Sequence, residues 1–373
     1  MALTYSLNGG AHLGQPRGGI SQGTIPLADL KPFSQTGVEF GFDVRLLDNR
    51  FGLDFTYYDQ STKDQILSTT ISSTSGFGRR VINAGEMSNK GIELLISTTP
   101  ARTADVRWDL DFNFAQNTNE VVSLVEGQTS LVLEESRNRG NFITADVGEP
   151  FGTIKGQRYL RQNVPNDENG DPDFCNATGP IVHDASGLPL RSGQLCILGN
   201  GTPDFIGGIS NRVRYKNFTL SALVDFSFGG DIFSVTNSSG YGNGLHKNTL
   251  PGRAEGFLVG EGVDQDGNPN SVQVDPQDYY QRIAGQIGEE FVYDASFAKL
   301  REVQLSYRLP NQWLRGTPIQ LATISLVGRN LWLIHSNVDN VDPESAFNIN
   351  TRGLEHSGVP QVRSFGFNFN VRL

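Results

Sequence analysis

The chain has 373 residues, a formal net charge of −10 and only 37% hydrophobic residues, although it carries 23 Phe and 10 Tyr. The acidic balance argues against a nucleic-acid partner, because nucleic acids select basic surfaces. No segment reaches the roughly 20 consecutive apolar residues of a membrane-spanning helix, so a helical membrane protein is excluded. A transmembrane β-barrel remains compatible with this composition, because alternating strands do not raise hydropathy averages.

Period-two alternation predicts four strands in the first third of the chain. Residues 38–46, 51–57, 91–97 and 106–114 each place apolar side chains at alternate positions. The residues between them point to the opposite face of an extended strand. Each segment is close to the ~10 residues that a tilted strand needs to cross a bilayer.

The same alternation returns in the second half of the chain. It is clear over 209–215, 218–228 and 302–307, poorer over 319–333, and clear again in a C-terminal strand over 365–373. The apolar face of that last strand carries Phe365, Phe367, Phe369, Val371 and Leu373. About nine strands of this kind predict an all-β, antiparallel fold.

The predicted connections alternate between short and long. The short ones cover residues 48–50, 99–103, 216–217 and 310–318. The long ones cover residues 72–80, 117–203, 229–294 and 335–363. Outer-membrane barrels combine short periplasmic turns with long extracellular loops, whereas a soluble sandwich has no reason to sort its loops in this way. The pattern therefore favours a transmembrane barrel.

Charged residues gather on the second face of the predicted strands. In a soluble sandwich this face would meet bulk water, and in a large barrel it would line a wet lumen. The candidate lumen-lining residues are Glu39, Asp43, Arg45, Asp54, Arg107, Asp109, Asp111, Arg212, Asp225 and Glu302.

Aromatic residues near the strand ends divide between the two faces. Tyr57, Trp108, Tyr215 and Tyr307 lie on the apolar face, which predicts an aromatic girdle at the membrane interface. Tyr58 lies on the polar face, so a role in the lumen remains open for it.

The two cysteines, Cys175 and Cys196, lie in one glycine- and proline-rich segment. A disulfide between them would fit an oxidising compartment, and two free thiols are the alternative. No catalytic, metal-binding or phosphate-binding motif is recognisable, so we expect neither an enzyme nor a cofactor. Residues 1–5 lack the basic and apolar regions of an export signal. For an exported barrel, this predicts the C-terminal portion of a longer chain.

Several motifs go beyond a generic barrel. Residues 83–94, NAGEMSNKGIEL, resemble a segment of the SusC/RagA-type TonB-dependent outer-membrane transporters. Residues 293–303, YDASFAKLREV, followed by Leu309 and Pro310, are similar to a second segment of that family. Shorter similar stretches lie at 148–152, 202–205, 215–218, 328–331 and 342–344. The resemblance covers nearly the whole chain.

This resemblance implies a 22-stranded barrel filled by an N-terminal plug domain, of which residues 1–373 would be the C-terminal portion. We expect the plug, the TonB box and the signal peptide to lie outside this sequence. The implied location is the lipid of the outer membrane of a Gram-negative, Bacteroidetes-like bacterium. The C-terminal strand, ending at Leu373, also resembles the recognition signal for assembly of such barrels.

The resemblance also implies a function and partners. The expected activity is TonB-dependent import of an oligosaccharide or peptide. A SusD-like lipoprotein would cover the outer face, and the TonB complex would act through the N-terminal region.

Two other classes of protein remain open on the sequence. A passive porin would need a complete barrel and no plug. A soluble β-sandwich for carbohydrate binding or adhesion would use the same alternation, with its apolar faces in a core. Dependence on detergent would separate the membrane barrel from the sandwich.

Overall fold

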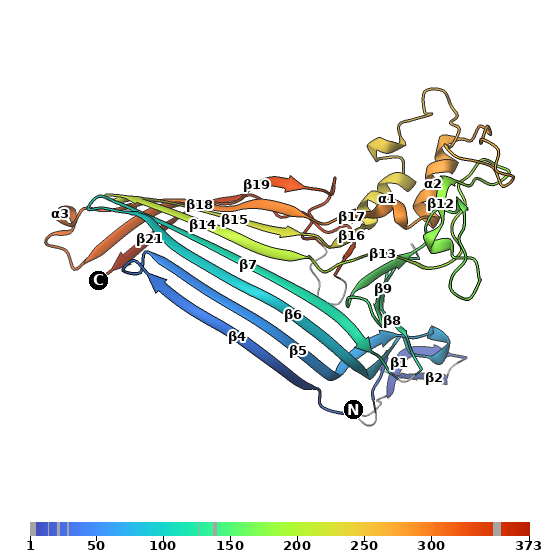
Figure 1. Ribbon diagram of the computed structural model, residues 1–373, viewed down its shortest axis with the longest axis horizontal. Helices are drawn as coiled ribbons and strands as arrows, with labels where there is room; N and C mark the ends of the chain where they lie inside the picture. Colours follow the sequence, from blue (N-terminus) through green and yellow to red (C-terminus); the bar gives the residue numbers. More distant parts are fainter. Residues whose placement is uncertain are drawn as a thin grey trace.

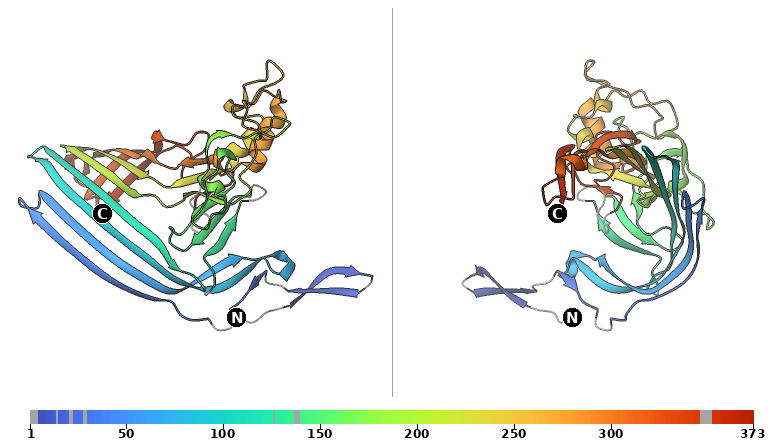
Figure 2. Two further views of the ribbon diagram at one scale, coloured as in Figure 1. Left: turned by 45° about the vertical axis from the view of Figure 1, so that its right-hand side comes forward. Right: turned by 90° about the vertical axis from the view of Figure 1, so that its left-hand side faces the viewer.

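The computed structural model describes residues 5–13, 15–20, 23–27, 30–125, 127–136, 140–345 and 352–373. Its main feature is one antiparallel sheet with the strand order β21-β19-β18-β15-β14-β7-β6-β5-β4. Figure 1 shows these strands side by side, and Figure 2 shows that the sheet is bent into an open trough. We call this sheet the wall. The predicted all-β, antiparallel fold is confirmed.

Every strand predicted from alternation is present in the wall. The strands are β4 (Ser34–Leu46), β5 (Phe51–Thr70), β6 (Arg79–Arg102), β7 (Val106–Ser123), β14 (Phe205–Tyr215), β15 (Phe218–Phe228), β18 (Phe297–Arg308), β19 (Leu321–Ser336) and β21 (Ser364–Arg372). The predicted length near ten residues is too short for β5, β6 and β7, which have 20, 24 and 18 residues. Their outer parts pack against the cap through Leu67, Ile82 and Val121, so alternation does not mark them.

The connections sort to the two ends of the wall, with one correction to their predicted lengths. One end has residues 47–50, 103–105, 216–217 and 309–320, the last containing α3 (Asn311–Leu314). The other end has residues 71–78, 124–204, 229–296 and 337–363. The connection at 71–78, which includes η1 (Ser73–Ser75), is brief because β5 and β6 extend into the predicted loop.

Residues 124–204 and 229–296 fold into a cap at the loop end of the wall (Figure 1). Its strands are β8 (Ser130–Glu135), β9 (Phe142–Asp146), β10 (Thr153–Gly156), β11 (Arg161–Asn163), β12 (Thr178–Ile181), β13 (Cys196–Asn200), β16 (Asp231–Ser234) and β17 (Val292–Asp294). Its helices are α1 (Val235–Gly242), α2 (Pro276–Gln286), η2 (Phe174–Asn176), η3 (Lys247–Thr249) and η4 (Glu289–Phe291). Three short N-terminal strands, β1 (Tyr5–His12), β2 (Gln15–Ile20) and β3 (Thr24–Ile25), precede the wall.

The main hydrophobic core lies in the cap. Ile143, Ile154, Phe233 and Phe291 are almost completely buried there, and they pack with Val121 from the end of β7. The helix α2 contributes one apolar side to this core through Tyr280 and Ile283. The cap therefore has the interior of a folded domain, whereas the wall does not.

The apolar face of the wall remains exposed. Phe367 of β21 is 81% exposed and Leu326 of β19 is 62% exposed, and these two residues are paired across the strands. The other predicted residues of the C-terminal face, Phe365, Phe369, Val371 and Leu373, are exposed too. A β-sandwich would bury such a face against a second sheet. In the described residues no second sheet covers the wall, so the sandwich alternative is wrong.

Candidate functional site

The pairing register places the predicted lumen residues on one face of the wall. Asp43 pairs with Asp54, and the same row continues across β6, β7 and β14 to Asp225. Arg212 pairs with Asp109 nearer the turn end. The remaining residues on this face are Glu39, Arg45, Arg107, Asp111 and Glu302. We call this the polar face, and its exposure to a lumen stays a prediction.

Three ion pairs of the predicted lumen-lining residues are partly open to solvent. They join Asp43 to Arg45 at 2.5 Å, Arg107 to Asp109 at 2.8 Å and Glu302 to Arg329 at 2.8 Å. Exposed pairs of this kind contribute little to stability. Their side chains therefore form a charged, hydrated surface and not a folded core.

The connection between β19 and β21 is described over residues 337–345 and 352–363, which contact β18 on the polar face, and we call these residues the strap. Lys299 of β18 binds it through Asp342 Oδ1 at 2.5 Å and Glu344 Oε2 at 2.6 Å. The side chains of Lys299 and Asp342 are only 8% and 9% exposed. A buried ammonium with two carboxylate partners fixes the strap to the wall.

A second cation of β18 extends this network. Arg301 donates to Asp225 Oδ2 at 2.7 Å, to Gln361 Oε1 at 3.0 Å and to Glu344. Glu344 and Gln361 belong to the two described parts of the strap, so one guanidinium holds both parts. Sequence reasoning missed Lys299, Arg301, Asp342 and Glu344 as interacting residues. In the sequence, this contact is indicated only by two cations on the polar face of one strand and by the acidic residues Asp342 and Glu344 in a later connection.

The strap is also anchored to the cap. Glu355, in β20 (Leu354–Glu355), is fully buried and accepts hydrogen bonds from Ser234 Oγ at 2.9 Å and from Thr236 N at 3.0 Å. These donors lie at the first turn of α1, where a carboxylate also interacts favourably with the helix dipole. The strap therefore connects the polar face of the wall with the cap.

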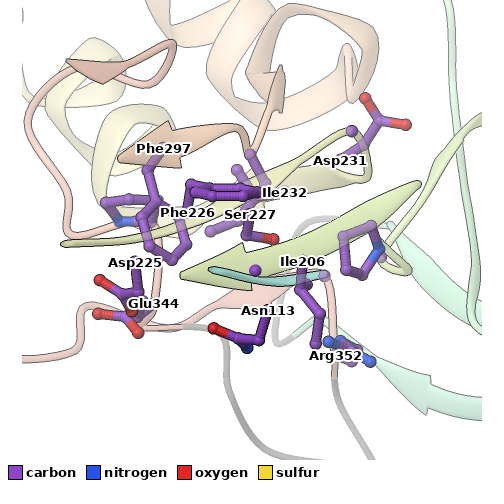
Figure 3. Close-up of a pocket in the computed structure, with 17 residues that line it drawn as sticks. Asn113, Ile206, Asp225, Phe226, Ser227, Asp231, Ile232, Phe297, Glu344 and Arg352 are labelled. Carbon is purple, nitrogen blue, oxygen red and sulfur yellow. The ribbon is translucent and has the colours of Figure 1, made fainter. Parts of the chain in front are cut away.

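A cavity of about 280 Å³ lies where the wall, the cap and the strap meet (Figure 3). Ile206 and Phe297 line it from the wall, Asp231 from the cap, and Glu344 and Arg352 from the strap. A concave site with an apolar lining and a few ionisable groups is a default candidate for ligand binding. Of the residues that line this cavity, only Asp225 is among the predicted lumen-lining residues.

The surroundings of Asp231 disfavour the ionised form of its carboxyl group. Burial raises its pKa, and the carboxylates of Asp294 and Asp204 raise it further, against a hydrogen bond from the backbone of Asn200. Asp231 Oδ2 accepts that bond at 3.0 Å. The cavity thus contains one carboxyl that protonates more readily than an ordinary aspartate.

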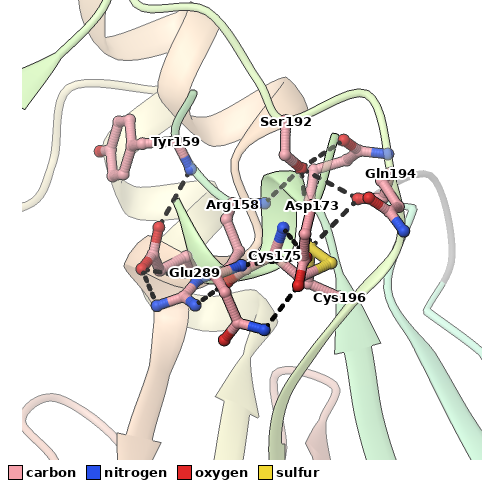
Figure 4. Close-up of a disulfide and its surroundings, with 10 residues drawn as sticks. Arg158, Tyr159, Asp173, Cys175, Ser192, Gln194, Cys196 and Glu289 are labelled. Atoms are coloured by element: carbon pink, nitrogen blue, oxygen red, sulfur yellow. Dashed lines mark hydrogen bonds and ion pairs between the residues drawn. A yellow bond between two sulfur atoms is a disulfide. The ribbon is translucent and has the colours of Figure 1, made fainter. Parts of the chain in front are cut away.

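The two cysteines lie in the cap and are joined in a disulfide (Figure 4), with their Cα atoms 5.2 Å apart. Arg158 donates to the carbonyl oxygen of Cys175 at 2.6 Å and pairs with Glu289 at 2.8 Å. Glu289 also accepts from the backbone of Tyr159 at 3.0 Å. The segment between the cysteines is thus tied to η4 through one arginine.

His183 is the most unusual ionisable group of the cap. Its ring is fully buried, stacks on Tyr279 with centroids 6.3 Å apart, and has no hydrogen-bond partner at either ring nitrogen among the described residues. Burial lowers its pKa, although the carbonyls of Val263 and Ile181 and the charge of Asp184 oppose this shift. The folded cap therefore favours the neutral ring.

We expect this histidine to make the cap sensitive to acid. Because its folded-state pKa lies below the unfolded value near 6.5, the unfolded chain binds more protons, and stability falls as the pH drops below that value. Thermal unfolding followed at several pH values should show this loss, and His183→Phe should reduce it. His356→Phe, at an exposed position, is the control and should leave the pH dependence unchanged. An identical pH dependence in His183→Phe would contradict the assignment.

Metal-binding groups and membrane-spanning helices are not found in the described part of the chain. None of its helices has both the length and the hydrophobicity to cross a membrane. Its His, Cys, Asp and Glu side chains form no group of three or more that could hold a metal ion. The acidic loop at Asp264 is a turn, in which Oδ1 accepts from the backbone of Asp266 and Asn268.

The one-layered wall, with its exposed apolar face and charged polar face, has the form of a transmembrane barrel wall. A family model described as "TonB dependent receptor-like, beta-barrel" matches residues 3–331. The chain belongs to that family, and the SusC protein among its relatives supports the SusC/RagA type. This confirms the predicted family and its barrel architecture.

Similar curated proteins are all longer than this chain. It is 29% identical to TonB-dependent receptor P3 of Formosa agariphila over 365 residues, covering 92% of this chain and 34% of that protein. It is 26% identical to TonB-dependent receptor SusC of Bacteroides thetaiotaomicron, covering 75% of this chain and 26% of SusC. The chain spans about a third of the length of the first of these relatives.

Solved structures of the RagAB peptide importer share the fold. The chain aligns with a structure of the RagAB peptide transporter with a TM-score of 0.71 and 20% identity, over 99% of this chain and 38% of that one. The "open-open" state of the RagAB peptide importer gives a TM-score of 0.66. At this identity the likeness shows the fold alone.

Proposed function

We propose that residues 1–373 form the C-terminal part of the barrel of an outer-membrane importer, which takes up an oligosaccharide or peptide nutrient with energy passed on by TonB. The observation that carries the proposal is the two-faced wall. One face is apolar and exposed, as lipid requires, and the other carries the charged rows and the strap. The chain would bind and conduct cargo without chemical conversion.

Two kinds of partner follow from this proposal. A SusD-like lipoprotein would close over the loop end, where the cap lies, and the TonB complex would act through a plug supplied by the rest of the protein. The relatives support this assignment through their family and their greater length. Cap and strap would then form the outer vestibule that cargo meets first.

Uptake by cells tests the proposal. Cells that carry the complete gene should accumulate a fluorescently labelled oligosaccharide or peptide, and cells without the gene should not. Collapse of the proton gradient should abolish uptake, because the energy reaches the importer from the inner membrane. Fractionation should recover the protein with outer membranes and in solution only with detergent.

Two results would point to other functions. Uptake that continues after the gradient collapses would indicate a passive porin. Recovery of a folded monomer without detergent would contradict the membrane location altogether.

A further inference from the structure

Three arginines form one cross-strand row on the polar face of the wall, near the end with the short turns. Arg107 of β7 pairs with Arg102 of β6 on one side and with Arg214 of β14 on the other. These strands are neighbours in the wall (Figure 1). Directly paired residues of antiparallel strands lie on one face with their Cβ atoms about 5 Å apart, and like charges placed in this way are destabilising. We call these three residues the arginine row.

The described residues neutralise the arginine row only in part. Arg107 pairs with Asp109 at 2.8 Å. The side chains of Arg102 and Arg214 have no hydrogen bond or ion pair with another described residue, and both residues are exposed. Positive charge thus gathers at this end, although the chain as a whole has a formal net charge of −10. Further arginines on the polar face near this end are Arg212, Arg308 and Arg372.

The loop end of the same face shows how this protein neutralises cations of the wall. There Lys299 and Arg301 of β18 are covered by an acidic segment, the strap, through Asp342 and Glu344. The connections beside the arginine row, residues 103–105 and 216–217, are too short to fold back over it. An acidic segment that covers the row therefore has to come from elsewhere in the protein.

We propose that the arginine row docks an acidic segment of the plug, the domain that the proposed function places inside the barrel. Guanidinium groups form paired hydrogen bonds with carboxylates, so a few Asp or Glu side chains on the plug would remove the repulsion within the row. The greater length of the relatives supports a further domain of this kind. The assignment rests on the proposed function, because that function supplies the plug.

Cross-linking of the complete protein in detergent micelles identifies what contacts the row. A carbodiimide joins an amine to a carboxylate without a spacer, so only groups in direct contact react. Arg214→Lys introduces a reactive amine into the row and keeps its positive charge. We expect this variant to form an amide bond with an Asp or Glu of the plug, detected by peptide mass spectrometry. Arg102→Lys should react in the same way from the other end of the row.

Lys216 is the control within the same molecule. It lies in the turn two residues beyond Arg214, and its Nζ lies 5.5 Å from the centre of the Tyr215 ring, on the apolar face. It should form no cross-link to the plug.

Removal of charge tests whether the contact holds the plug. In a planar lipid bilayer, release of the plug by urea appears as ionic conductance through the barrel. We expect Arg102→Gln/Arg214→Gln to conduct at lower urea than wild type, with the opening equilibrium shifted about tenfold, equivalent to about 1.4 kcal/mol. Lys216→Gln should open with wild type. Without a partner for the row, the double substitution would only relieve repulsion between strands, and opening would not become easier.

Three results would overturn the docking proposal. They are the absence of cross-links from folded Arg214→Lys and Arg102→Lys to the plug, cross-links to a separate polypeptide instead, and equal urea dependence of the double variant and wild type. Energised uptake by cells carrying the gene, together with any of these results, would reject the docking and leave import standing. Absence of uptake with the wild-type gene would reject import, whether or not the cross-links form.

Discussion

Replacing Lys299 with methionine is expected to release the strap from the wall at a cost of about 3–5 kcal/mol. The substitution leaves Asp342 buried without its cation, and Glu344 keeps only Arg301. The loss of the ion pair and the buried, uncompensated carboxylate of Asp342 both destabilise the folded state. Removing one partner of a buried pair therefore costs more free energy than the pair contributes. This is the largest effect that the described contacts predict.

Hydrogen exchange measures this release where it occurs. The backbone amides of Glu344 and Gln361 both donate to Asp342, so they report directly on its position. Their exchange should accelerate by about a hundredfold or more, since each 1.4 kcal/mol changes an opening equilibrium tenfold. Lys247→Met is the matched control. Lys247 pairs with Asp339 at 2.7 Å, but both side chains are about two-thirds exposed, so little change is expected.

Unchanged exchange in Lys299→Met would show that the strap is held by Arg301 and Glu355 alone. Acid offers an independent check. Burial raises the pKa values of Asp342 and Glu344, but hydrogen bonds outweigh it and hold both pKa values below their ordinary range. Asp342 accepts from Lys299 and from the backbone amides of Glu344 and Gln361, and Glu344 accepts from Arg301 and Lys299. Carboxylates with depressed folded-state pKa values stabilise above the unfolded values, near 3.8 and 4.5, and lose that contribution below them. Protection of the strap should therefore fall in strong acid.

Replacing Val224 with arginine is expected to destabilise the protein in lipid by about 2–4 kcal/mol. Val224 lies on the apolar face, paired with Ile209 and Leu300. It is near the middle of β15, whose ends are Phe218 and Phe228. The middle of the strand is the part expected at the centre of the bilayer, where a guanidinium loses most of its hydration.

Leu223→Arg is the sharpest control, because Leu223 is the adjacent residue and points to the polar face. Leu220→Arg adds a test of depth: Leu220 is on the apolar face but two residues from the start of β15, where the cost falls to about 0–1 kcal/mol. Urea unfolding in lipid vesicles, followed by tryptophan fluorescence, measures all three variants. Equal stability of Val224→Arg and Leu223→Arg would reject the assignment of the apolar face to lipid.

The strands of the wall could be predicted from the sequence, because the alternation of residues within one strand indicates which of its faces is apolar. Val38, Phe40 and Phe42 of β4 alternate with Glu39, Gly41 and Asp43. This pattern is visible without any knowledge of the neighbouring strand β5. Cross-strand pairing then adds the register without changing either face. The same reasoning failed at the ends of β5 to β7, where the strands leave the two-faced environment and join the cap. The family motifs pointed to nearly the whole wall but not to the contacts that their side chains make.

The candidate site was predicted only in part. Alternation placed Glu39 and Asp225 on the polar face, and it left Tyr58 there without a partner. It could not show that Gly91 makes room for the Tyr58 ring, or that Lys299 meets Asp342 across 43 residues of chain.

By itself, the sequence determined the strands of the wall, their two faces and the family, because period-two alternation and short motifs are local properties. Only the tertiary structure decided where the strap contacts the wall, which carboxylates share Lys299 and where the core of the cap lies. These features depend on contacts between long connections. Such contacts form only when the gain from burial and charge pairing exceeds the entropy of ordering the loops, a balance that no local pattern records.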